Sequence, residues 1–175
     1  NIPIIINAVS GYSGGGKSMI SYFEEKDHEP FFNYGLNLNH KHLPEIIYHN
    51  NLALTPIFSP SVGNFIQGMI VSIPLHFSWF NNKVDTKKIQ FLMEEFYSGA
   101  NFIKVLKRDE GVSDKGYFRP DNLVGTNCLD ISIFGNNDNN QIIISSRLDN
   151  LGKGASGAAI QSMNIALGFD ETMGL

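Results

Sequence analysis

The sequence holds 175 residues, of which 42% are hydrophobic and 17% charged, as in ordinary globular proteins of one domain. The net charge is −4 and no run of Lys and Arg occurs. The sequence therefore lacks the basic patch that is typical of proteins that bind nucleic acids or membrane surfaces. No apolar stretch is long enough to span a bilayer. The lone cysteine, Cys128, excludes an internal disulfide and suits a reducing compartment. We therefore expect a cytoplasmic protein.

The first third of the chain predicts short elements joined by loops. Pro3 to Asn7 is an apolar run typical of a strand, and a Gly-rich turn and a helix from Lys17 to Glu25 follow it. Phe31 to Asn39 reads as extended. Pro44 opens a helix that runs to His49, because proline is favoured in a first helical turn. The next segment is expected to be a loop, since it contains Pro56, Pro60 and Gly63.

The middle of the chain carries clearer periodicity. From Met69 to Phe77 apolar residues alternate, which predicts a strand, with Ile70 and Pro74 on the face opposite the main stripe. Thr86 to Ser98 predicts an amphipathic helix, ended by Gly99, with an apolar stripe of Ile89, Leu92, Met93, Phe96 and Tyr97. Phe102 to Leu106 predicts another strand.

The last third predicts a hairpin and a helix. Leu129, Ile131 and Ile133 alternate, the polar run from Gly135 to Asn140 turns the chain, and Ile142 to Leu148 returns. Small residues from Ala155 onward predict a tightly packed helix ending at Leu167. Because strands predominate and adjacent ones form hairpins, we expect an α+β fold with a mixed, largely antiparallel sheet.

The stretch from Gly11 to Ser18, GYSGGGKS, fits the phosphate-loop pattern G-x-x-x-x-G-K-[ST]. In a nucleotide triphosphatase, Lys17 would reach the outer phosphates and Ser18 would hold Mg²⁺. Such folds need parallel strands separated by helices and an acidic residue that ends a later strand. Since the later strands here are joined by short turns, a glycine-rich turn without a triphosphate is favoured.

Two histidines, His40 and His42, stand two residues apart before Glu45. In an extended segment, they would project to one side. Two imidazoles and one carboxylate fall short of a metal site, so no metal is expected. Acid–base chemistry is the alternative, because imidazole titrates near neutral pH, and so is a pair of surface histidines without a role.

Three further stretches are candidates with structural alternatives. DNLGKGASG, from Asp149 to Gly157, places glycines before a helix, where a ligand could approach the backbone or the chain could simply turn. SPSVGNFIQGM, from Ser59 to Met69, is a loop in which Asn64 and Gln67 offer amides. Cys128 lies in an apolar segment and is interpreted as a buried small hydrophobe.

Four ordered stretches together resemble the C-terminal catalytic and dimerisation region of N-acetyl-γ-glutamyl-phosphate reductases, in the shorter type of the family. They are NAVSGYSGGGK, HKHLPEI, PSVGNFIQGM and DNLGKGASGAAIQSMN. Gln67 stands where another branch of the family carries arginine. The resemblance covers residues 1–175 and implies one domain, with a Rossmann NADP-binding domain and the nucleophilic cysteine lying upstream. It implies a reductase of arginine biosynthesis that converts N-acetyl-γ-glutamyl phosphate to the semialdehyde and phosphate.

The resemblance also implies roles for residues of this chain. His40, His42 and Glu45 would be catalytic; Asn64 and Gln67 would bind substrate. The Gly-rich turn would approach NADP, and the cofactor contacts implied are Ser10, Gly11, Gly14, Asn150 and Gly154. A homo-oligomer formed through the sheet face is expected. A triphosphatase and a non-catalytic assembly module remain the alternatives from other functional classes.

Overall fold

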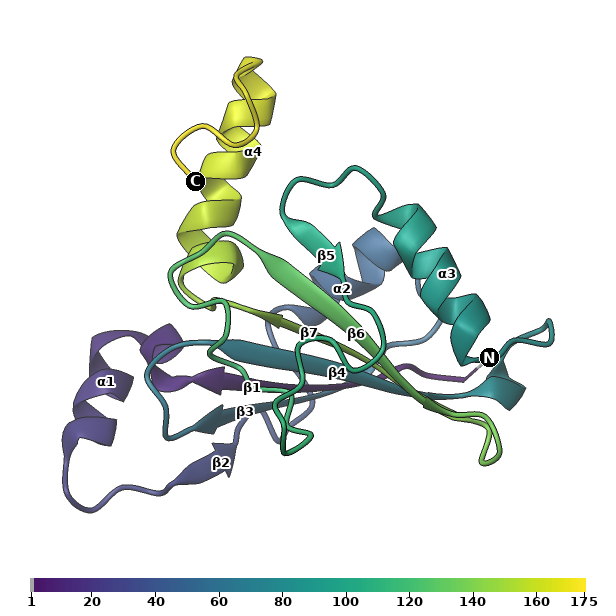
Figure 1. Cartoon of the computed structure of the whole chain (residues 1–175). Coiled ribbons are helices and arrows are strands. Elements are labelled where there is room, and N and C mark those ends of the chain that lie inside the picture. Colours follow the sequence, from purple (N-terminus) through teal and green to yellow (C-terminus); the bar gives the residue numbers. More distant parts are fainter. Residues whose placement is uncertain (1) are drawn as a thin grey trace.

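The computed structural model describes residues 2–175, which form one mixed sheet flanked by helices (Figure 1). Within these residues the sheet has seven strands, in the order β2-β3-β1-β4-β7-β6-β5. The strands are β1 (Ile5–Gly11), β2 (Phe31–Asn33), β3 (Ile57–Gly63), β4 (Met69–His76), β5 (Ile103–Val105), β6 (Leu129–Asn136) and β7 (Gln141–Leu148). The predicted α+β class with a mixed, largely antiparallel sheet is confirmed: β1 and β3 are parallel, as are β5 and β6, and the other neighbours are antiparallel.

The helices are α1 (Gly16–Glu24), α2 (Leu43–Asn50), α3 (Thr86–Phe96) and α4 (Gly157–Leu167). Two of them cover one face of the sheet. Leu43 of α2 packs on Ile6 and Ala8 of β1, and Ile89 of α3 packs on Ile133 and other apolar residues of the hairpin. In the predicted α3 stripe, Ile89 and Met93 reach this core, whereas Leu92 and Phe96 are 41% and 78% exposed.

The predicted strand from Met69, the helix from Thr86 and the hairpin are confirmed within two residues at their ends. The expected loop around Pro60 is wrong, because Ile57–Gly63 is a central strand. Proline is tolerated there since the β2 ladder covers only residues 61–63, and the Pro60 carbonyl on that side accepts from Tyr34 N–H (3.1 Å). The expected extended segment from Phe31 forms a strand only to Asn33.

The helix α4 extends away from the sheet (Figure 1). A π-helical turn, Gly152–Ser156, precedes it. The predicted tight packing holds at Gly157, where a Cβ would lie 2.2 Å from Asn127 Oδ1. It does not hold along the outer part of α4, since Ile165 and Leu167 are 59% and 62% exposed.

Candidate active site

His40 and His42 lie close together in a tight turn that leads into α2. The expectation of an extended segment is wrong, because His42 has helical backbone angles (φ −83°, ψ −10°) and caps α2. The backbone N–H of Leu43 donates to His40 O (3.0 Å), which closes the turn. The two rings nevertheless meet edge to face, with centroids 4.9 Å apart.

Aromatic side chains hold His40 from two other segments. The centroid of its ring lies 4.9 Å from the ring centroid of Phe58 on β3 and 5.7 Å from that of Tyr34, which follows β2. His40 is half-buried, whereas His42 is exposed. Burial, then the nearby His42 and Lys41, lowers the pKa of His40 below its usual value. Burial also raises the pKa of Tyr34. The site therefore pairs a restrained neutral imidazole with an accessible one.

Glu45 lies in the first turn of α2 and is exposed. Within residues 2–175 its carboxylate makes no hydrogen bond to either imidazole. That Glu45 orients a histidine therefore stays a prediction.

Backbone hydrogen bonds join the Gly-rich turn to the loop between β3 and β4. The N–H groups of Gly11, Tyr12 and Ser13 donate to the carbonyls of Gly68, Phe65 and Ile66, at 2.9, 3.0 and 3.0 Å. A Cβ on Gly11 would lie 2.6 Å from Ile66 O, so only glycine fits there. The triphosphatase alternative is not supported, because these N–H groups are already occupied and β1 has an antiparallel neighbour.

Three of the predicted cofactor contacts converge beside this turn. A Cβ built on Gly14 would lie 3.1 Å from Asn150 Nδ2 and 3.4 Å from Ser10 Oγ. Asn150 accepts from Gly68 N–H (2.7 Å) and donates to Ser13 Oγ (3.1 Å). Asn150 thus joins the end of β7 to both loops.

Asp149, which begins the DNLGKGASG stretch but is not among the predicted site residues, is the centre of the neighbouring network. It is 1% exposed and accepts from Gln67 Nε2 and from the backbone N–H groups of Gly125 and Leu151. Burial raises its pKa, but these hydrogen bonds outweigh burial and hold it below the usual range. Gln67 therefore ties its loop to β7, while Asn64 in the same loop is exposed.

Gly154 lies in the π-helical turn, where its N–H donates to Asp149 O (2.8 Å). A pocket of about 620 Å³ opens beside this turn, lined among others by Gln67, Asp149 and Cys128. Cys128 is only partly buried, so its interpretation as a buried hydrophobe holds in part.

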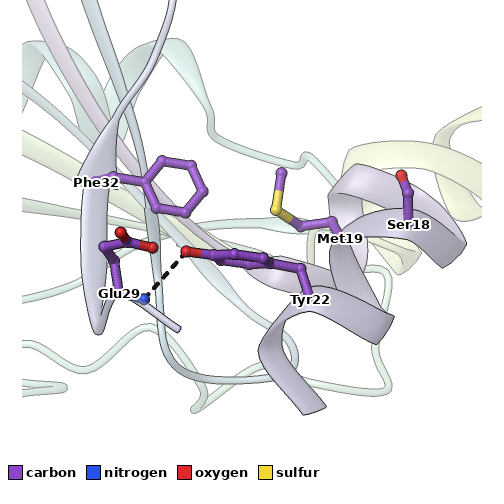
Figure 2. Close-up of a pocket in the computed structure, with 5 residues that line it drawn as sticks. All are labelled: Ser18, Met19, Tyr22, Glu29 and Phe32. Atoms are coloured by element: carbon purple, nitrogen blue, oxygen red, sulfur yellow. Dashed lines mark hydrogen bonds between the residues drawn. The ribbon is translucent and has the colours of Figure 1, made fainter. Parts of the chain in front are cut away.

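A separate apolar groove of about 520 Å³ lies between α1 and β2 (Figure 2). Ser18, Met19, Tyr22, Glu29 and Phe32 line it. Figure 2 shows the Tyr22 ring reaching from α1 toward Glu29, whose N–H donates to the Tyr22 hydroxyl (3.1 Å), with the Phe32 ring close to it.

Two negative findings apply to residues 2–175. No cluster of three or more His, Cys, Asp or Glu side chains could hold a metal ion there. In the same part of the chain, no helix combines the length and apolarity that crossing a membrane requires.

Curated relatives match the chain over nearly its whole length. It is 42% identical to N-acetyl-gamma-glutamyl-phosphate reductase 2 of Nostoc sp. over 100% of this chain and 58% of that protein. It is also 42% identical to the N-acetyl-gamma-glutamyl-phosphate reductase of Brucella ovis, over 95% of this chain and 55% of that one. The chain thus spans somewhat more than half the length of these relatives.

Solved structures share the fold at low identity. The aspartate semialdehyde dehydrogenase II of Vibrio cholerae matches 93% of this chain and 54% of its own, with a TM-score of 0.64 and 12% identity. The aspartate semialdehyde dehydrogenase of Francisella tularensis matches 94% of this chain and 57% of its own, with the same TM-score and identity. The family model described as "Semialdehyde dehydrogenase, dimerisation domain" matches residues 1–150. The chain therefore belongs to the semialdehyde dehydrogenase dimerisation-domain family.

Proposed function

We propose that this chain is the C-terminal catalytic and dimerisation domain of an NADP-dependent N-acetyl-γ-glutamyl-phosphate reductase of the cytoplasm. The observation that carries the proposal is the 42% identity to named reductases along the entire chain. In this proposal residues 1–175 form one domain, and an upstream Rossmann domain supplies most of the cofactor site and the nucleophilic cysteine.

The proposed reaction is the reductive dephosphorylation of N-acetyl-γ-glutamyl phosphate. The upstream thiolate attacks the acyl carbon, phosphate leaves, and the resulting thioester is reduced to the aldehyde with release of the thiolate. The nicotinamide, when bound, supplies the hydride for that reduction. The imidazoles of His40 and His42 are the groups of this chain suited to assist the thiol and to stabilise the oxyanion near neutral pH.

The polar side chains of Asn150 and Ser10 lie next to Gly14 and would offer hydrogen-bonding groups to this part of the cofactor. Ser10, Gly14, Asn150 and Gly154 would lie next to NADP, whereas Gly11, whose N–H group and missing Cβ face the loop between β3 and β4, would shape the turn. Asn64, whose side chain is exposed, would contact substrate directly. Gln67 would act mainly by shaping its loop, since its amide already donates to Asp149.

The test is an assay of NADPH oxidation in the presence of N-acetyl-γ-glutamyl phosphate, with the longer parent protein and with this chain alone. We expect turnover from the parent and none from the chain. Omission of the acyl phosphate is the control. A rate from the chain alone would contradict the upstream placement of the nucleophile, and an inactive, folded parent protein would contradict the reductase assignment.

We also propose that the chain forms a homodimer through the sheet face opposite α2 and α3, as the dimerisation-domain family suggests. Small polar residues cross this face in register: Ser59, Asn7 and Ser72 are exposed or partly exposed, whereas Ser145 and Ser132 are buried within the chain. Beside it lie Pro74, Ile143 and Phe134. Ile143 is 42% exposed and Ile57 44% exposed. Such a partly apolar face is suited to meet a second copy.

A further inference from the structure

His40 makes a hydrogen bond that fixes its tautomer. Its Nδ1 accepts from the backbone N–H of His42, at 3.2 Å. A ring nitrogen that accepts from an N–H group cannot itself carry a proton, so in the neutral ring the proton is on Nε2. Within residues 2–175, Nε2 has no hydrogen-bond partner. The ring therefore presents one free donor.

The surroundings keep this ring in place and uncharged. Phe58 and Tyr34 contact it from β3 and from the segment after β2, and His42 contacts it edge to face. The titratable or charged groups facing it are Tyr34, from the segment after β2, and Lys41 and His42 along its own turn. None of these is an anion at neutral pH, and a second cation would be repelled.

We propose that neutral His40 serves as a fixed Nε2–H hydrogen-bond donor to the acyl oxygen of the substrate, and that His42 alone carries the mobile proton. The inference rests on the proposed reductase function and divides the roles of a pair that the sequence leaves equivalent. A donor held before the oxyanion forms stabilises it without rearrangement. His42, exposed and without a ring hydrogen bond within the described residues, is free to exchange protons with substrate or thiol.

Two substitutions separate this role from the alternatives. His40→Gln places an amide N–H close to where Nε2 lies. The glutamine cannot titrate, and it does not replace Nδ1 as the acceptor of the His42 N–H. His40→Asn places its Oδ1 near the position of Nδ1, where it accepts the N–H two residues on, but it lacks the distant donor. We expect the parent enzyme to retain kcat within a few-fold in His40→Gln. We expect His40→Asn to lose about 10²- to 10³-fold, the usual effect of removing one oxyanion donor.

The other outcomes each overturn the proposal. Retained activity in His40→Asn with loss in His40→Gln would show that the ring serves only the turn. Suppose instead that both His40 variants lose activity, and that their pH–rate profiles lack the same limb that His42→Gln lacks. His40 would then be a proton carrier.

A measurement without turnover tests the tautomer. In this chain labelled with ¹⁵N-histidine, we expect His40 to show an unprotonated Nδ1 and a protonated Nε2 above neutral pH, with exposed His49 on α2 as the reference. A proton on Nδ1 would refute the proposal. The expected tautomer in a parent protein that lacks reductase activity would instead refute the proposed function.

Discussion

The side-chain amide of Gln67 donates to both carboxylate oxygens of Asp149, at 2.8 and 2.7 Å. The two residues join the loop before β4 to the end of β7, next to Asn150 of the proposed cofactor site. Gln67→Leu should lower the free energy of unfolding by about 1–3 kcal/mol, because the buried carboxylate loses a donor. Urea unfolding followed by circular dichroism measures the change.

Two variants in the same loop sharpen this test. Gln67→Arg should keep most of the stability, because a guanidinium can donate to both oxygens. Asn64→Ala should change the free energy of unfolding by less than about 0.5 kcal/mol, as is usual for exposed sites. Equal stability of Gln67→Leu and wild type would show that the other donors to Asp149 suffice.

A buried ion pair anchors the long segment between β5 and β6. Arg147 donates from Nε and Nη2 to Asp130 Oδ2 (2.9 and 2.7 Å) and from Nη1 to Gly111 O (2.8 Å), and Phe118 stacks on it. Arg147→Met should cost about 3–5 kcal/mol, because it leaves the Asp130 carboxylate buried and unpaired.

The matched variant for this pair is Arg147→Met combined with Asp130→Leu. Since the double substitution leaves no buried charge, we expect it to recover most of the lost stability. Urea midpoints give the comparison. A double variant as unstable as Arg147→Met would mean that Arg147 acts through its contacts with Gly111 and Phe118 instead.

Stability should depend on pH through His40. Its pKa is lowered on folding, so the unfolded chain binds more protons and stability rises with pH. The contribution is complete above about pH 6.5, the ordinary pKa of histidine, and is lost as the pH falls through the lowered value. Urea midpoints from pH 5 to 8 should fall less steeply toward acid in His40→Asn than in wild type. Identical slopes would contradict this prediction.

Periodic elements could be predicted from the sequence because their pattern is local. The alternation from Met69 and the hairpin closed by Gly135 to Asn140 each contain their own signal. The strand that contains Pro60 could not be predicted in this way. Its pairing depends on β1 and on where β2 ends, and both are distant from Pro60 in the sequence.

The candidate site divides in the same way. The motifs around His40 and Gly11 could be recognised, but Asp149 and Tyr34 could not, since their roles depend on contacts between separate strands and loops. The sequence predicts that the absence of a side chain at Gly11 admits a ligand. In the structure, however, the chain's own loop at Ile66 is the closest neighbour there.

The last prediction concerns the sheet face opposite α2 and α3. Ile143 is the third residue of β7 and is 42% exposed, so Ile143→Lys should fold normally but place a charge in the proposed dimer interface. Burying an unpaired ammonium is costly, and the variant should therefore be monomeric. Leu92→Lys is the control, because Leu92 is similarly exposed (41%) but lies on α3, across the sheet from that face. Light scattering at tens of micromolar should give a dimer for wild type and Leu92→Lys, and a monomer for Ile143→Lys. A dimer in all three would place the interface elsewhere on the molecule.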